Sequence, residues 1–196
     1  MFNYLYQHWA FMSLPIAIFS TLILWCNASH IDPVVFWIWM LFPVYLLHQF
    51  EEHAYPGGFK DSINAQFFKL DPKGPLTDAA VFWINIPDIW LLFPLIAALS
   101  QLVSPKIGVL LPYFTIFNGA LHVILAIVKK AYNPGLFTSL CLNIPIGGYA
   151  LYLAGKENLL DTATNFYGIG GTLLLHLSII LYVVYKIRVD RRHTIK

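Results

Sequence analysis

Six long runs of apolar residues follow one another along the chain of 196 residues. They cover roughly residues 9–27, 34–50, 79–100, 106–128, 136–154 and 166–187. Most of them reach the ~20 residues that an α-helix needs to cross ~30 Å of hydrocarbon. Prolines inside several runs are compatible with this, because membrane helices tolerate proline where neighbours satisfy the freed carbonyl groups. The sequence therefore predicts an all-α integral membrane protein, a bundle of six transmembrane helices that forms one domain over residues 1–196.

The amino-acid composition excludes several other classes of protein. Only 11% of the residues are charged and 58% are hydrophobic, whereas a soluble domain carries about a quarter charged residues. The net charge is only +2 and no basic run has interleaved aromatic residues, so a nucleic-acid partner is excluded. Cys26 and Cys141 form no C-x-x-C motif, so neither a disulfide framework nor a thiolate zinc site is expected. No Lys or Arg precedes the first apolar run, so we expect a retained span rather than a cleaved signal peptide.

The positions of the basic residues predict the orientation of the bundle. If both termini are cytoplasmic, ten of the twelve Lys and Arg residues lie inside, and only Lys106 and Lys156 lie outside. This is the bias that the positive-inside rule expects. We therefore predict that both termini are cytoplasmic and that the protein lies in a plasma or inner membrane.

The loop at residues 51–78 is the longest connection, and this topology makes it cytoplasmic. Its middle part, KDSINAQFFKL, is compatible with a short interfacial helix that places Phe67, Phe68 and Leu70 against lipid. An ordinary amphipathic connector is the alternative. Pro-Gly turns in YPGGF and YNPGLF border the second and fourth runs on this same side, where they form either a lid or simple helix ends.

Imidazole and carboxylate side chains follow directly on the second apolar run, in the stretch HQFEEH. His48 precedes Glu51 by three residues and Glu52 by four, so on a helix both carboxylates can share a face with His48. Histidine and carboxylate at one-turn spacing are a known arrangement for binding a divalent metal. This stretch is therefore the first candidate for a functional site.

Four further spans carry polar side chains at a similar depth, in the predicted cytoplasmic half of the bilayer. These residues are Asn85, Asp88, Asn118, His122, Asn143 and His176. An ionisable side chain is costly inside a membrane unless it is paired. Their convergence at one depth predicts a shared polar cavity, with scattered interhelical hydrogen bonds as the alternative.

The cavity would hold a divalent metal, and its candidate ligands are His48, Glu51, Glu52, His122 and His176. The candidate catalytic carboxylates are Glu51, Glu52 and Asp88. The residues expected around the metal or the substrate are His53, Asn85, Asn118, Tyr132 and Asn143. Imidazole with carboxylate suits zinc, iron or manganese. Two metal-free alternatives stay open: a glutamate as general base with a histidine partner, or rim carboxylates that interact with Lys129 and Lys130.

The stretch HQFEEHAYPGGF resembles the hallmark of a family of small multi-pass membrane proteins named for its H-x-x-E-E motif. The later stretches NGALH and YNPGLFT resemble the other recurring blocks of that family, so the resemblance covers roughly residues 40–150. It draws attention to His48, Glu51, Glu52, His122, Tyr132, Pro134 and Gly135. It implies no reaction, because the family has no assigned function.

The first functional hypothesis is a metal-dependent membrane enzyme, most simply a hydrolase, that acts on a lipid-like or amphipathic substrate in the cytoplasmic half of the bilayer. An iron oxygenase is a less favoured variant, because histidine-rich di-iron sites need more imidazoles than this chain places together. A metal-free acid–base isomerase or cyclase is the second hypothesis. The third is a small proton-coupled transporter with a relay through Asp88, His122 and His176. Membrane lipid and a lipid-like small molecule are the expected partners.

Overall fold

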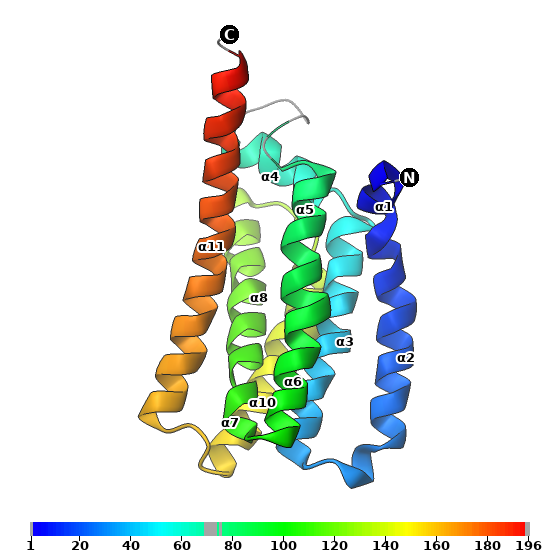
Figure 1. The fold of residues 1–196 in the computed structure, drawn as a ribbon, viewed down its shortest axis with the longest axis vertical. Helices are drawn as coiled ribbons and strands as arrows, with labels where there is room; N and C mark the ends of the chain where they lie inside the picture. The colour runs from blue at the N-terminus through cyan, green and yellow to red at the C-terminus, as the bar shows by residue number, and fades with distance from the viewer. Residues whose placement is uncertain (1, 69–73, 75, 195–196) are drawn as a thin grey trace.

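The computed structural model describes residues 2–68, 74 and 76–194, and every regular element in these ranges is helical. Six helical stretches stand side by side (Figure 1), each long and apolar enough to cross a membrane. We number them spans 1 to 6: Phe2–Cys26, Pro33–His53, Asp78–Leu102, Pro105–Lys129, Leu136–Lys156 and Thr162–Tyr185. The prediction of an all-α bundle with six spans is confirmed.

Several spans are built from more than one helical element. Span 1 contains α1 (Phe2–His8), η1 (Trp9–Met12) and α2 (Ser13–Cys26), and η2 (Ala28–His30) follows it. Span 2 is the single helix α3 (Pro33–His53), and α4 (Phe59–Phe68) lies between spans 2 and 3. Span 3 contains α5 (Asp78–Asn85), η3 (Ile86–Leu92) and α6 (Phe93–Leu102). Span 4 contains α7 (Pro105–Gly108) and α8 (Leu110–Lys129). Span 5 contains α9 (Leu136–Thr138), η4 (Ser139–Asn143) and α10 (Ile144–Lys156). Span 6 is the part of α11 (Thr162–Thr194) that ends at Tyr185.

The two π-helical stretches, η3 and η4, each end two residues before a proline, Pro94 and Pro145 respectively. Proline has no backbone N–H, so the carbonyl group one turn earlier loses its helical partner. A wider π turn is a common local adjustment, and it occurs frequently at functional sites. In span 5 this turn lies directly beside the residues of the candidate site described below.

Helix α3 lies at the centre of the bundle. Of its most apolar stretch, 67% of the residues are buried, against 33% or less in each of the other spans. Asp32 caps its first turn by accepting hydrogen bonds from the backbone nitrogens of Val34 and Val35, and Pro33 provides a fixed φ at its start. It packs against α2, α6, α8 and α10, and the polar residues His48, Gln49, Glu51 and Glu52 near its end are buried.

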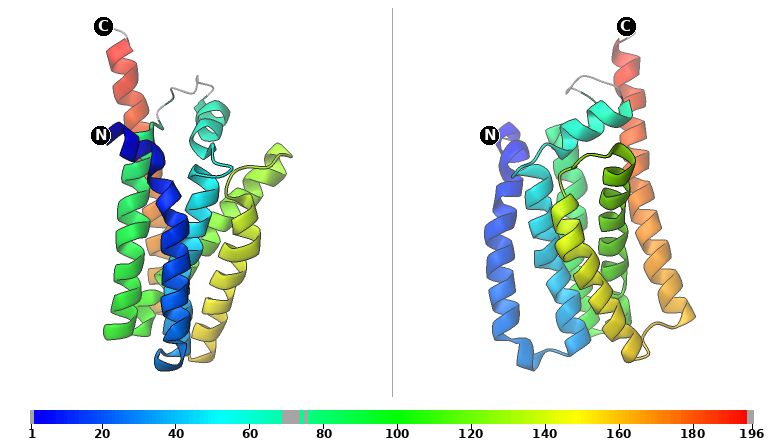
Figure 2. Two further views of the ribbon diagram at one scale, coloured as in Figure 1. Left: turned by 90° about the vertical axis from the view of Figure 1, so that its right-hand side faces the viewer. Right: turned by 180° about the vertical axis from the view of Figure 1, so that it is seen from behind.

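The two ends of the described chain lie at the same end of the bundle, together with α4 and the connection between α8 and α9 (Figures 1 and 2). The last turn of α3, which carries the HQFEEH stretch, also lies at this end. The common location agrees with an even number of spans. That this end faces the cytoplasm stays a prediction.

Helix α4 supplies the short helix that the sequence suggested within residues 51–78. It is held to the start of span 3 by a hydrogen bond of 2.6 Å from Lys60 Nζ to Asp78 Oδ1 and by paired hydrogen bonds between Asn64 and the backbone of Leu76. Phe59, the first residue of α4, packs against His53 at the end of α3, with ring centroids 5.8 Å apart. The lipid contacts predicted for Phe67, Phe68 and Leu70 are not tested, because the structure describes neither the side chains of the two phenylalanines nor Leu70.

Candidate metal centre

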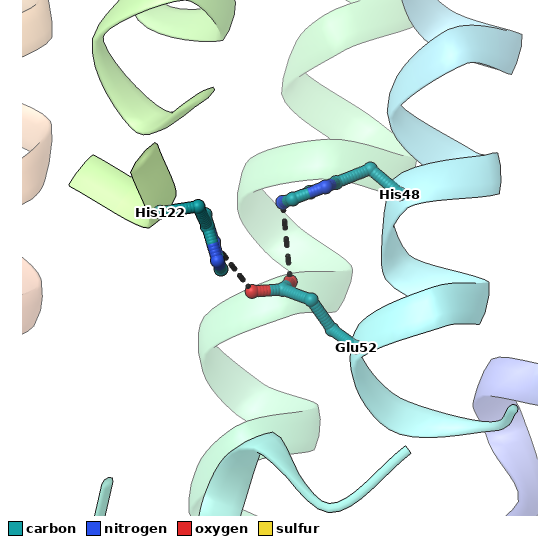
Figure 3. Close-up of side chains that lie close together, drawn as sticks. All are labelled: His48, Glu52 and His122. Carbon is teal, nitrogen blue, oxygen red and sulfur yellow. Dashed lines mark ion pairs between the residues drawn. The ribbon is translucent and has the colours of Figure 1, made fainter. Parts of the chain in front are cut away.

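His48, Glu52 and His122 form a buried group at the end of the bundle (Figure 3). His48 and Glu52 lie one turn apart on α3, and His122 lies on α8. One nitrogen or oxygen atom of each residue lies within 4.8 Å of the others, and the residues are 0%, 5% and 4% exposed. His122 Nε2 is 3.0 Å from Glu52 Oε1, and His48 Nε2 is 3.6 Å from Glu52 Oε2. The one-turn spacing in the sequence therefore does bring an imidazole and a carboxylate to one face of the helix.

A hydrogen bond to Asn133 determines the tautomer of His122. The Asn133 amide nitrogen donates to the backbone carbonyl of His122 at 3.0 Å, which fixes the orientation of the amide group. Its carbonyl oxygen then lies 2.6 Å from His122 Nδ1, and an oxygen of this kind only accepts. His122 Nδ1 therefore carries a proton, and in the neutral imidazole Nε2, which points at Glu52, has a lone pair that can act as a ligand.

A second chain of hydrogen bonds determines the tautomer of His48 in the same way. The Thr138 hydroxyl donates to Glu51 Oε2 at 2.5 Å. Because a hydroxyl has a single proton, Thr138 must accept the hydrogen bond of 2.8 Å that joins its oxygen to His48 Nδ1. In the neutral imidazole His48 Nε2 then has no proton, and this nitrogen has no hydrogen-bond partner among the residues that the structure describes.

These two tautomers make the centre of the group an electron-rich position. Glu52 contributes a carboxylate, and His48 and His122 each direct an Nε2 lone pair toward it. Such groups repel one another at these distances unless a proton or a metal ion lies between them. Metal-binding histidines almost always donate their other ring N–H to a neighbouring acceptor, as both histidines do here.

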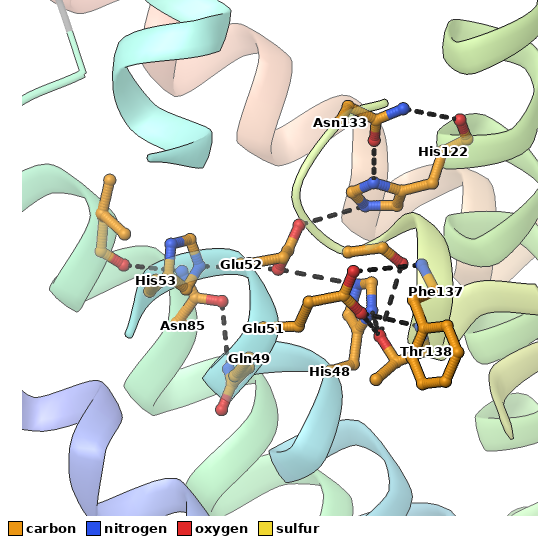
Figure 4. Close-up of polar contacts among 12 residues, drawn as sticks. His48, Gln49, Glu51, Glu52, His53, Asn85, His122, Asn133, Phe137 and Thr138 are labelled. Atoms are coloured by element: carbon orange, nitrogen blue, oxygen red, sulfur yellow. Dashed lines mark hydrogen bonds and ion pairs between the residues drawn. The ribbon is translucent and has the colours of Figure 1, made fainter. Parts of the chain in front are cut away.

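Glu51 has a different role from Glu52, although the two residues are adjacent. Its carboxylate accepts four hydrogen bonds. One comes from the Tyr132 hydroxyl at 2.7 Å. The others come from the Phe137 backbone N–H at 3.0 Å and from the Thr138 backbone N–H and hydroxyl at 2.7 and 2.5 Å (Figure 4). The structure does not bring Glu51 into the group around Glu52. The sequence interpretation of Glu51 as a ligand or a catalytic base therefore differs from its place in the structure, where its acceptor capacity is committed to span 5.

The two backbone donors identify what Glu51 does. Phe137 and Thr138 lie in the first turn of span 5, where helix N–H groups have no partner within the helix. A carboxylate at this position satisfies them and interacts favourably with the helix dipole. Glu51 thus caps span 5 from a neighbouring helix and fastens the connection between α8 and α9 to α3.

Tyr132, which the sequence placed near the metal or the substrate, contacts Glu51 rather than the group itself. Partial burial, together with the hydrogen bond to Glu51 and its charge, raises the pKa of Tyr132 well above its usual value. The hydroxyl therefore keeps its proton and remains a donor to Glu51 at neutral pH.

Gly135 covers the group from the side of the connection between α8 and α9. Its φ of +98° lies in the left-handed region that favours glycine. A Cβ atom there would lie 2.7 Å from His122 Cε1, 2.8 Å from His48 Cε1 and 2.9 Å from Glu52 Cγ. Only glycine fits this close approach, so the YNPG turn covers the group on this side. Whether it acts as a lid or only ends the helix stays a prediction. Phe59 packs against the His122 ring as well, with ring centroids 5.5 Å apart.

His53 lies next to the group without belonging to it. Its Nε2 is 3.5 Å from Glu52 Oε2, and that nitrogen has no hydrogen-bond partner among the described residues. Asn85 instead joins span 3 to α3, because its side-chain oxygen accepts a hydrogen bond of 3.0 Å from Gln49, whose own oxygen accepts one of 2.9 Å from Trp90. His53 is therefore a titratable neighbour of Glu52 outside the group, and Asn85 supports the packing of span 3 beside it (Figure 4).

The structure does not bring His176, a predicted ligand, to this group. Its ring packs against Phe114 and Phe117, with ring centroids 4.6 Å away in each case, and its Nδ1 lies 2.9 Å from the Thr172 carbonyl oxygen of the same helix. Depth along a helix follows from the sequence, but the direction in which a side chain points does not. His176 has a similar predicted depth and a different neighbourhood.

Three other predicted residues also lie outside the group. Asp88 is half-buried within η3. Asn143 is fully buried in η4, and neither of its side-chain polar atoms has a hydrogen-bond partner in the described part of the chain. The side-chain oxygen of Asn118 also has no hydrogen-bond partner among the described residues. The group therefore takes its residues from two spans, whereas the sequence predicted that five spans would contribute.

Two residues that hold the histidines, Asn133 and Thr138, were absent from the sequence prediction. Both belong to the YNPGLFT stretch, whose proline and glycine suggested only a turn. The signal in the sequence that could have identified them is that two polar residues flank a glycine turn directly before an apolar helix. A threonine in the first turn of a helix has a backbone N–H that needs a partner.

The fold and this group together define a small integral membrane protein with a buried cluster of imidazole and carboxylate side chains at one end of its bundle. A family model described as "Protein of unknown function with HXXEE motif" matches residues 39–150. This is more than half of the chain, so the chain belongs to that family, and His48, Glu51 and Glu52 are the residues of its motif. Neither a curated protein nor a solved structure matches the chain.

Proposed function

We propose that the protein is an integral membrane metalloenzyme in which His48, Glu52 and His122 bind one divalent ion. The observation that carries this proposal is that both histidines have a protonated Nδ1 held by an acceptor and an Nε2 directed at Glu52. Two imidazoles and one carboxylate suit zinc, iron or manganese. Three protein ligands leave one position open in a four-coordinate site, which is the arrangement of catalytic rather than structural zinc sites.

The reaction that we propose is hydrolysis of a lipid-like or amphipathic substrate. A bound divalent ion lowers the pKa of a water molecule and so supplies a nucleophile at neutral pH. Asn133 and Thr138 keep the two histidines oriented, and Gly135 and Phe59 restrict access of bulk water. His53 is the neighbouring titratable side chain that is free to exchange a proton with Glu52.

One observation favours a second candidate function, a metal-free acid–base enzyme such as an isomerase or cyclase. The 3.0 Å between His122 Nε2 and Glu52 Oε1 is also a normal hydrogen-bond length, so a shared proton can take the position of the ion. The transporter hypothesis gains no comparable support, because neither Asp88 nor His176 belongs to the group that contains His122.

Elemental analysis of the purified full-length protein tests the proposal. After incubation with zinc, iron(II) or manganese and removal of the excess, we expect about one equivalent of one of these metals in the wild type. His48→Ala, Glu52→Gln and His122→Ala should each lower the metal content severalfold or more, since each removes one of three ligands.

His176→Ala is the matched control, because it also removes a half-buried imidazole from a span but lies outside the group. It should keep the metal. Absence of stoichiometric metal from the wild type, with activity that survives chelators, would instead support the acid–base alternative.

A further inference from the structure

A groove of about 430 Å³ lies between α3 and the start of span 5, next to the metal centre. Its walls are mainly apolar, with Leu47 and Phe50 from α3 facing Phe137 and Leu142 from span 5. This volume falls within the ~300–1,000 Å³ range of small-molecule sites. The groove is therefore large enough to hold part of a ligand.

The location of the groove determines whether lipid or water can enter it. Leu47 and Leu142 belong to spans 2 and 5, which are long and apolar enough to cross a membrane. Phe137 is 65% exposed, and the groove is also lined by Tyr55, Pro56 and Tyr132, which lie just outside spans 2 and 5. The groove therefore joins the apolar part of two spans to the end of the bundle, as the hydrocarbon chain and polar end of an amphipathic molecule would require.

One part of the groove wall is polar, and it is connected to the metal centre. Glu51, Tyr132 and Thr138 line the groove together with the apolar residues. Thr138 also bonds to His48, so a single hydroxyl group separates Glu51, at the groove, from a ligand of the proposed metal. A chain lying in the groove thus has one end near the reacting centre.

The hydrogen bonds at this wall also define the chemistry of that end. The Tyr132 hydroxyl donates its only proton to Glu51, and the Thr138 hydroxyl does the same. What remains for a ligand is acceptor capacity on the Tyr132 oxygen, because the Glu51 carboxylate already accepts four hydrogen bonds. A ligand must therefore bring a hydrogen-bond donor. A carboxylate or phosphate would instead lie beside the negative charge of Glu51, and neither Tyr132 nor Thr138 has a hydroxyl proton left to donate to it.

We propose that this groove is the substrate-binding site and that it takes one long acyl chain whose uncharged polar end carries an amide or ester bond for hydrolysis and a hydrogen-bond donor, either the amide N–H or a neighbouring hydroxyl. A long-chain alcohol has the same kind of donor and no bond to hydrolyse, so it serves as a probe of this site. This assignment rests on the proposed function, since it supplies the substrate class for the same centre. The chain would lie between Leu47 and Leu142, and its polar end would donate to the Tyr132 oxygen.

Photolabelling of the full-length protein in lipid nanodiscs tests this assignment. The probe is a long-chain alcohol with a diazirine in its chain, compared with the fatty acid of the same length and diazirine position. We expect saturable labelling of peptides that contain residues 47–50 and 137–142. Unlabelled alcohol should compete for this labelling about tenfold better than unlabelled acid, because the acid places a second negative charge beside Glu51.

Two tryptophan substitutions on the same π turn provide the matched comparison. Leu142 lines the groove, whereas Leu140 is 52% exposed and does not. Leu142→Trp should therefore reduce the labelling about tenfold, and Leu140→Trp should leave it unchanged. The competition experiment needs no substitution, so it remains decisive if Leu142→Trp does not fold.

Metal analysis of the same samples separates this proposal from the proposed function. Loss of labelling with retained metal in Leu142→Trp supports the groove as a site distinct from the ligands. Saturable labelling of a protein that binds no metal would refute the metalloenzyme and leave the groove as a binding site. Labelling that does not saturate, equal labelling of the two tryptophan variants, or equal competition by alcohol and acid would overturn the groove assignment.

Discussion

Glu51 accepts two hydrogen bonds from the single residue Thr138, one from its backbone nitrogen at 2.7 Å and one from its hydroxyl at 2.5 Å. Because the same hydroxyl accepts from His48, Thr138 couples the capping of span 5 to the orientation of a proposed ligand. The HxxEE motif therefore combines two roles on one helical turn. Its histidine and second glutamate belong to the proposed metal centre, and its first glutamate fastens span 5 to α3.

The two adjacent glutamates should respond to the same substitution in opposite ways. Glu51→Gln replaces one carboxylate oxygen by an amide nitrogen, which is itself a donor and would face the N–H and hydroxyl donors that Glu51 now accepts from. We therefore expect the free energy of unfolding to fall by about 2 kcal/mol, the typical cost of an unsatisfied buried group. Glu52→Gln should change stability less, because it removes the negative charge from between two histidines, but it should lose the metal. Thermal unfolding in detergent and metal analysis of both variants provide the measurement. Equal metal loss in both, with unchanged unfolding temperatures, contradicts this division of roles.

The arrangement of spans follows from the sequence because hydrocarbon imposes one dominant requirement, that each crossing segment is a long apolar helix. Six runs meet it, and the structure has six spans. The residues at which the helices end are predicted less well than the number of spans. The second run was expected to end at residue 50, yet α3 continues through His53, because loops from other spans bury the polar last turn that composition alone assigns to the membrane rim.

The candidate site was only partly predictable, for two physical reasons. Helical periodicity relates His48 to Glu52 within one helix, so this pair follows from spacing. The meeting of α3 with α8 depends on how each helix is rotated, and the sequence contains no such information about His122 or His176. The supporting contacts of Asn133 and Thr138 depend on the path of the loop between α8 and α9, which no periodic pattern describes.

Gly135→Ala should disrupt the proposed metal centre without removing any of its three proposed ligands. The new methyl group would approach both histidines and Glu52 within 3 Å at a backbone conformation that alanine rarely adopts. We expect a loss of metal together with destabilisation of about 2 kcal/mol, which is typical of a strained backbone position.

Gly148→Ala is the control for this substitution. Gly148 lies in α10, and a Cβ atom added to it would meet no other atom within 4 Å, so alanine should keep the metal and leave stability unchanged or slightly higher. Measurement of metal content and unfolding temperature distinguishes the two variants. Retention of metal in Gly135→Ala would show that the YNPG turn does not approach the centre this closely.

Substitution of Thr138 tests whether its hydroxyl orients His48. Thr138→Val keeps the shape of the side chain and removes the hydrogen bonds to His48 and Glu51. We expect metal affinity to fall about 10–100-fold, the usual effect of losing a partner that orients a ligand. Thr138→Ser keeps the hydroxyl and should bind metal like the wild type. Competition with a chelator of known affinity measures the difference, and equal affinities of the Val and Ser variants would remove this role.

Removal of the metal should destabilise the wild type and leave a ligand variant unaffected. An ion that binds only the folded protein stabilises it by about 2.7 kcal/mol when its free concentration is 100 times the dissociation constant. A chelator should therefore lower the unfolding temperature of the wild type and of His176→Ala, whose histidine lies outside the group. It should have no effect on His122→Ala, which lacks one of the three ligands. If the chelator leaves the wild type unchanged as well, a shared proton between Glu52 and His122 accounts for the geometry better than a metal does.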